Sequence, residues 1–202
     1  AWIAAEPIPL YKTGLGTFTR PISSRVPGVQ AYFDQGLQMM FSFAKREAVQ
    51  SFRAAWKLDP NCAICFWGEA WAWGSYLNAP MSPAESPHAY AAVQQAMRLR
   101  EKATPVERAL IEALSVRYVE HFDAAKRVEQ DRAYRDAMEK VAARYPDDLD
   151  IQVFFADALF LLEPRRATRD HTSPSVRRLH EVLESVLSRN VHHPGACHLY
   201  VH

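Results

Sequence analysis

The sequence predicts an all-α fold, in which a solenoid of antiparallel helix pairs follows an extended N-terminal arm. From residue 29 onward, apolar residues recur with the helical period almost throughout, and prolines interrupt them where helices are expected to end. Residues 1–28 instead hold four prolines and three glycines, with apolar residues at no helical period. We therefore divide the chain into an extended arm, 1–28, and a helical repeat domain, 29–202.

The stretch 29–62 carries the clearest internal pattern. Small residues at positions 8 and 20 of this unit, Gly36 and Ala48, allow its two helices to approach each other closely. A large residue at position 24, Phe52, is expected to fill the contact with the next pair, and Pro60 ends the second helix. Together with Tyr32, Met39 and Ala55, these residues follow the tetratricopeptide (TPR) pattern, whose helix–turn–helix unit has about 34 residues.

Two further units follow with weaker patterns. The second begins at Ala63 and contains a proline-rich insertion, 78–87, before its second helix. The third spans roughly 104–146. Its start is well marked, because Thr104 is a good N-cap, Pro105 suits the first helical position and Glu107 can complete a capping box.

The last part of the chain predicts a fourth unit and the start of a fifth. The fourth runs from about Leu149 to Pro194, with a loop over 163–174 that ends in the helix start Ser173-Pro174. Residues 195–202 would open the first helix of a fifth unit. That helix has no stop signal and the chain begins with Ala, so we expect a longer parent protein.

Composition excludes two classes of partner. The 24 Lys and Arg and the 23 Asp and Glu are scattered along the chain, so we expect no basic patch and no nucleic-acid partner. The longest apolar stretch, 151–162, is interrupted by Asp157. It predicts a buried helix, and we expect no membrane span.

The first helices of the first two units are expected to present an apolar surface. In TPR stacks, positions 2, 5, 9 and 12 of these helices line the concave face. The predicted ligand-binding residues on it are Phe33, Leu37, Met40, Trp67 and Trp71. Such a surface is not normally left facing water. Two interpretations remain open: a protein, peptide or small apolar ligand occupies it, or the arm covers it with Ile8, Leu10, Tyr11 and Phe18.

The C-terminal segment predicts a metal site. Four of the eight histidines lie in residues 192–202, and His198 and His202 have the i,i+4 spacing that places both on one helix face. Neutral imidazoles so placed can bind one Cu, Zn or Fe ion. His193 and Asp150 are candidates for further ligands. Leu199 stands where zinc peptidases carry the glutamate base, which excludes that mechanism.

The alternative is that these histidines cap and pack helices, and the sequence carries no recognisable catalytic motif. The pair Cys62 and Cys65 also admits two interpretations, a local disulfide or two buried free thiols. Haem attachment is excluded because Phe66 follows the pair where a histidine is needed.

Three segments carry a narrower resemblance: AVQSFRAAWKLDPNCAICFWGEAWAWG, ERALIEAL and HHPGACHLYVH. The chain resembles a group of exported bacterial TPR proteins of unclear function. The resemblance implies an extracytoplasmic location, periplasmic or secreted, and further histidine-containing helices after residue 202. It implies no agreed activity. We rank a binding scaffold with an aromatic concave face first, and a metalloprotein or metalloenzyme second.

Overall fold

The structure is a computed structural model of the whole chain and describes residues 7–164 and 169–202. Within those residues it contains helices and no strand, so the all-α prediction is confirmed. The start of the predicted arm, 1–6, and part of the predicted loop, 165–168, lie outside the described residues. The α-helices are α1 (Val29–Phe41), α2 (Lys45–Leu58), α3 (Ala63–Trp73), α4 (Ser86–Leu99), α5 (Pro105–Ser115), α6 (Arg127–Arg144), α7 (Leu149–Phe160), α8 (Pro174–Arg189) and α9 (Pro194–Val201). Two 3₁₀ turns, η1 (Arg100–Lys102) and η2 (Ala124–Lys126), complete the set.

The helix starts follow the local signals in the sequence. The Thr104 side chain accepts a hydrogen bond from the Glu107 amide, and the Glu107 carboxylate accepts one from the Thr104 amide, which completes the capping box of α5. Ser173 caps α8 through the Val176 amide. These bonds satisfy amides that the first turn of a helix leaves without partners.

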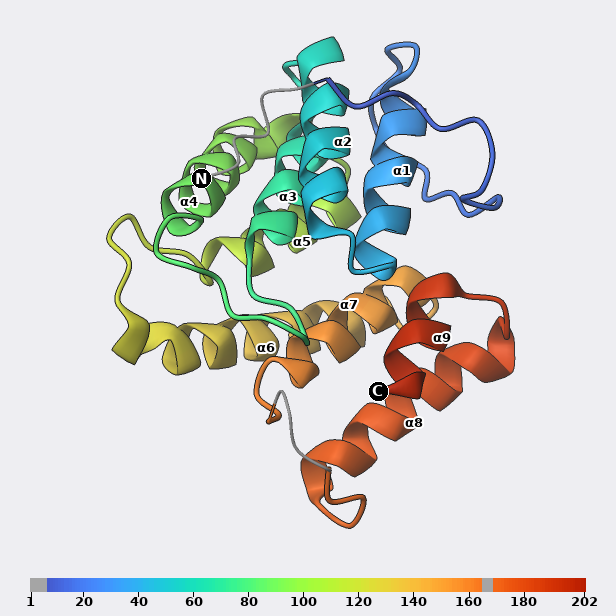
Figure 1. Cartoon of the computed structure of the whole chain (residues 1–202), viewed down its shortest axis with the longest axis vertical. Coiled ribbons are helices and arrows are strands. Elements are labelled where there is room, and N and C mark those ends of the chain that lie inside the picture. The colour runs from blue at the N-terminus through green and yellow to red at the C-terminus, as the bar shows by residue number, and fades with distance from the viewer. Residues whose placement is uncertain (1–6, 165–168) are drawn as a thin grey trace.

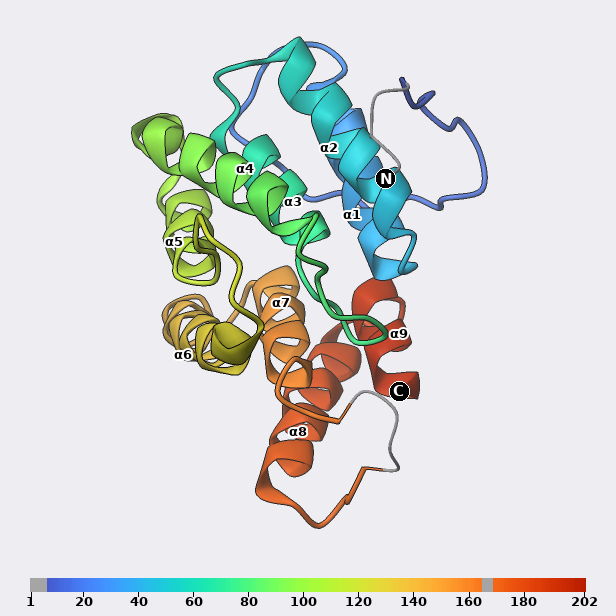
Figure 2. The same cartoon turned by 60° about the vertical axis from the view of Figure 1, so that its left-hand side comes forward.

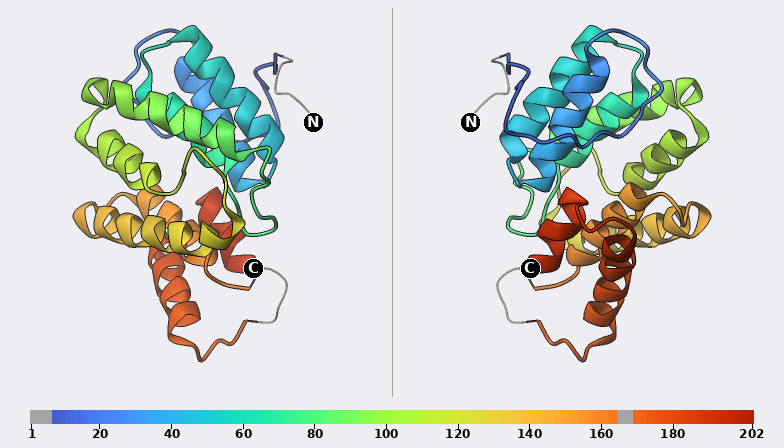
Figure 3. Two further views of the ribbon diagram at one scale, coloured as in Figure 1. Left: turned by 90° about the vertical axis from the view of Figure 1, so that its left-hand side faces the viewer. Right: turned by 90° about the vertical axis from the view of Figure 1, so that its right-hand side faces the viewer.

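Consecutive helices make the most extensive contacts, above all α1 with α2 and α3 with α4. Figures 1 and 2 show α1 to α4 in the upper part of the molecule and α6 to α9 in the lower part. The two parts also meet directly, because α9 contacts α1 as well as α7 and α8. Figures 1 and 2 and the right-hand view in Figure 3 show α9 next to the C-terminal end of α1. The chain therefore curls back on itself and brings its last helix against its first.

Phe52 of α2 lies between α1 and α3, as the repeat pattern predicts. Its ring is fully buried and meets the ring of Phe33 edge-on, with centroids 5.5 Å apart. A methyl group on Gly36 would lie 2.6 Å from a Phe52 ring atom, and one on Gly68 would lie closer still. The two glycines are thus required because the aromatic ring fills the space that their side chains would take.

No helix in residues 7–164 and 169–202 combines the length and the apolar character that a membrane crossing needs.

Candidate functional site

The five residues predicted to line an apolar binding face are buried. Phe33, Leu37 and Trp67 are fully buried, and Met40 and Trp71 are 6 % and 3 % exposed. The ring of Phe154, on α7, packs edge-on against Trp67 and Trp71, with centroid distances of 5.2 and 5.1 Å. Trp67 and Trp71 are therefore covered by Phe154 of α7, which neither the ligand nor the arm interpretation anticipated.

The arm contributes only at the margin of this aromatic cluster. Ile8 is buried, and the half-buried Phe18 packs edge-on against the Phe41 ring at 5.3 Å. Leu10 and Tyr11 are exposed, so of the four arm residues named for the covering interpretation only Ile8 and Phe18 are withdrawn from solvent.

A small cavity remains where α1, α3, α7 and α9 meet. Its volume is about 10 Å³, room for about one water molecule. Met40 and Trp71 line it, together with Asp157, whose carboxylate accepts a 3.1 Å hydrogen bond from the Trp71 indole. Burial raises the pKa of Asp157, and the Arg117 charge and this hydrogen bond oppose the rise only in part.

His198 and His202 meet at the exposed end of α9. Their Nε2 atoms are 3.3 Å apart, and both rings lie over Phe43, at centroid distances of 4.1 and 5.5 Å. Two nitrogens bound at 2.0–2.1 Å to one tetrahedral ion are separated by about 3.3–3.4 Å. The pair therefore has the spacing of two ligands on one metal ion.

The tautomer of His198 follows from its other ring nitrogen. Nδ1 is hydrogen-bonded to the backbone carbonyl of Phe41. A carbonyl only accepts, so Nδ1 carries the proton and Nε2 presents its lone pair toward His202. Metal-binding histidines are commonly fixed by such a bond. The pKa of His202 is lowered by burial and by the nearby His198 and Arg169, which favours the neutral ring.

His193 and Asp150 form a second, separate pair. His193 Nε2 lies 2.9 Å from Asp150 Oδ1, while Nδ1 accepts the Ala196 amide at 3.3 Å as the N-cap of α9. Nε2 is consequently the donor, and both ring nitrogens are engaged. The His–carboxylate contact resembles that of a proton-transfer dyad, but no nitrogen is left to take a substrate proton.

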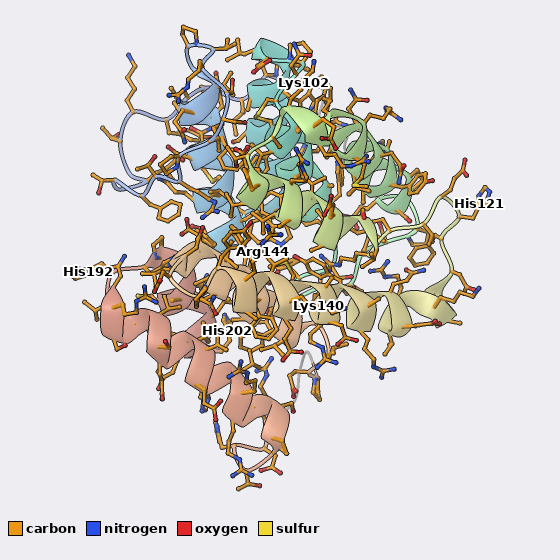
Figure 4. The ribbon with its side chains drawn as sticks, turned by 180° about the vertical axis from the view of Figure 1, so that it is seen from behind. Lys102, His121, Lys140, Arg144, His192 and His202 are labelled. Atoms are coloured by element: carbon orange, nitrogen blue, oxygen red, sulfur yellow. A yellow bond between two sulfur atoms is a disulfide. The ribbon has the colours of Figure 1, made fainter. Side chains whose placement is uncertain are left out.

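The four predicted metal ligands are thus brought together two by two. Among residues 7–164 and 169–202, no group of three or more His, Cys, Asp or Glu side chains is arranged to hold an ion. Figure 4 labels His192 and His202. His192 lies at the turn before α9, well apart from His202. His198 and His202 therefore remain as the candidate pair.

Sequence reasoning missed two histidines near this pair. His171 stacks on His180 of α8 at a centroid distance of 5.5 Å, and His180 lies 5.8 Å from the ring of Tyr200. With His202 they line a cleft of about 310 Å³ between α8 and α9. His171 lies in a predicted loop and His180 on an ordinary amphipathic helix, so no sequence spacing linked either to residue 202.

Cys62 and Cys65 are joined by a disulfide at the start of α3, and both residues are buried. Of the two interpretations left open by the sequence, the structure contains the disulfide. Cys197 is a free, exposed cysteine on α9.

Asp150 also contacts the arm. Its Oδ2 accepts a 2.7 Å hydrogen bond from Arg20, so one carboxylate joins the arm, α7 and the α9 cap. Burial alone would raise the pKa of Asp150, but the His193 hydrogen bond and the Arg20 charge outweigh it and hold the pKa below the usual range.

We expect the protein to become less stable in acid, because protonation of Asp150 weakens its contacts with His193 and Arg20. A carboxyl group whose folded pKa is depressed contributes fully above its unfolded pKa, about 4, and loses that contribution as the pH falls through the folded value. The urea concentration at the unfolding midpoint should therefore decrease as the pH is lowered below about 4. In Asp150→Asn this decrease should be smaller. The pKa values of Asp34 and Asp157 are raised and act in the opposite direction, so the difference between the two proteins isolates Asp150. Identical pH profiles would contradict this assignment.

The sequence matches no family model, and comparisons with curated proteins and with solved structures find no significant match.

Proposed function

We propose that the chain is a TPR-type α-solenoid that binds a transition metal ion through His198 and His202. The observation that carries the metal-binding proposal is the 3.3 Å separation of the two Nε2 atoms, with Nδ1 of His198 held by the Phe41 carbonyl. Imidazole ligands suit Zn, Cu and Fe ions. Two protein ligands leave coordination positions for water or substrate, as hydrolytic or oxidative chemistry requires.

The repeat assignment is supported by the order and packing of the helices. Helix pairs follow one another along the chain, and Phe52 of α2 fills the contact with α3 at the position where the TPR pattern places a large residue. Gly36 of α1, at the small position 8 of the pattern, faces this ring, and so does Gly68 of α3.

The metal proposal is tested on untagged protein incubated separately with Zn, Cu and Fe salts and then desalted. We expect near-stoichiometric metal by elemental mass spectrometry, and its loss from a His198→Ala, His202→Ala double variant. The matched control is His121→Ala, His192→Ala, which removes two exposed histidines at other places and should retain the metal.

Circular dichroism establishes that all three proteins keep their helical content. No metal uptake by the wild-type protein, or equal uptake by both double variants, would refute the proposal.

Partner binding is the second candidate function. It is favoured by a cleft of about 510 Å³ between the arm, the start of α7 and the α8–α9 turn. Phe18 and Leu149 supply apolar surface there, and Asp150, His192 and His193 supply polar groups. A mixed lining of this kind is typical of ligand and peptide sites.

An extracytoplasmic location, periplasmic or secreted, is part of the proposal. The Cys62–Cys65 disulfide supports it, because disulfides persist in oxidising compartments.

A further inference from the structure

One face of α1 holds the arm by its backbone. The Gln30 side chain donates to the Arg20 carbonyl at 2.8 Å and accepts the Ile22 amide at 3.1 Å. Gln38 donates to the Phe18 carbonyl at 2.8 Å, and Asp34 accepts the Arg20 amide at 3.0 Å. Residues 30, 34 and 38 are four apart and lie on one helix face, along which the extended arm runs (Figure 3).

Gln35 repeats this arrangement earlier in the arm. Its amide group accepts the Tyr11 N–H at 2.8 Å and donates to the Pro9 carbonyl at 3.1 Å. Like Gln30, it both donates to and accepts from the backbone of the arm, as a neighbouring strand would. These bonds make no demand on the side chains of the arm, so they suit any extended segment.

Two arm side chains enter specific pockets. Arg20 is 7 % exposed and forms a two-pronged contact with Asp148, at 2.8 and 2.9 Å, besides its 2.7 Å bond to Asp150. Phe18 lies against the rings of Phe41 and His193, at centroid distances of 5.3 and 5.7 Å. A planar guanidinium paired with carboxylates gives directional recognition, and an aromatic anchor adds buried area.

The arm therefore docks as a bound peptide does. Backbone hydrogen bonds supply sequence-tolerant affinity, and two pockets select an aromatic residue two positions before an arginine. We propose that this surface is a docking site for an extended Phe-x-Arg peptide, filled in the structure by the chain's own Phe18-Thr19-Arg20. The same site accepts a Phe-x-Arg peptide from another molecule when the arm is weakened. The inference rests on the partner-binding role and is independent of metal uptake, which is measured with the arm in place.

The test uses a fluorescent peptide of residues 9–23, PLYKTGLGTFTRPIS, and the full chain. A tethered arm competes at an effective concentration of about a millimolar, so the wild-type protein should bind the peptide weakly. The Phe18→Ala, Arg20→Ala variant should bind it on the order of 100-fold more tightly by fluorescence anisotropy, because the weakened arm no longer competes. A peptide carrying the same two substitutions should lose that gain.

A second form of the experiment keeps the test decisive if the double variant does not fold. A protease site inserted after the exposed Arg25 allows the folded protein to be cut, so that the arm stays bound without a covalent link. The labelled wild-type peptide should then exchange into the cut protein, and the doubly substituted peptide should not.

Failure of both peptides to bind to either folded protein would overturn the proposal, and so would equal binding of the two peptides. Neither result would bear on the metal measurement. Peptide binding without metal uptake would leave the docking site standing and refute the metal site alone.

Discussion

Phe52→Ala is expected to lower the free energy of unfolding by about 3–5 kcal/mol, the usual cost of removing a large aromatic side chain from a closely packed core. The ring is fully buried between Gly36 of α1 and Gly68 of α3, and neither glycine has a side chain that could fill the space left by its removal. The loss should appear as a lower urea midpoint, measured by circular dichroism.

Val128→Ala serves as the control for this substitution. Val128 is 60 % exposed on α6, so its truncation should change stability by less than about 0.5 kcal/mol. A loss below about 1 kcal/mol for Phe52→Ala would show that α1, α2 and α3 do not depend on this ring.

Arg117→Met is expected to cost about 3 kcal/mol, the lower end of the range for breaking a buried ion pair. Arg117 has no exposed side-chain surface. It donates to Asp131 at 3.1 Å and to the Ser75 carbonyl at 2.8 Å, and its guanidinium lies 5.0 Å from the centroid of the Tyr134 ring. Methionine fills similar volume but leaves the Ser75 carbonyl without this donor. Arg127 still pairs with Asp131 at 2.7 Å, which limits the loss.

The control is Arg178→Met, which removes an exposed ion pair with Glu181. Exposed pairs contribute between about 0 and 1 kcal/mol, so this variant should unfold close to the wild-type urea midpoint. Equal losses for the two arginines would mean that the buried network around Arg117 contributes no more than a surface pair.

The arm and the candidate metal pair are linked through Phe41. Asp150 joins the arm, α7 and the cap of α9, whereas the rings of His198 and His202 lie over Phe43 at the exposed end of α9. Phe41 lies between the two: its ring packs on Phe18 of the arm, and its carbonyl oxygen accepts a hydrogen bond from Nδ1 of His198. Loss of the arm would therefore remove a contact of Phe41, the residue whose carbonyl orients His198.

Much of the helical framework could be predicted from the sequence because its signals are local. The capping box at Thr104 depends on residues three positions apart, and the Gly36–Phe52 contact lies within one helix pair. The i,i+4 spacing also predicted that His198 and His202 share a helix face, because backbone geometry alone fixes that relation.

The binding surfaces could not be predicted in the same way. Trp67 and Trp71 were expected to face a groove, but Phe154 covers them from more than eighty residues further along the chain. Asp150 was assigned to the same metal site as His198, yet it binds His193 and Arg20 instead. Each of these outcomes depends on contacts between elements that are far apart in the chain, such as those of α9 with α1.

The sequence by itself thus determined the helices, their order and the residues that fill the contacts within a pair, because each depends on neighbours along the chain. Only the tertiary structure decided which faces are buried, which ligand candidates meet and where the arm docks. Those relations join residues such as Arg20 and Asp150, which are far apart in sequence and come together only when the last helices return to the first.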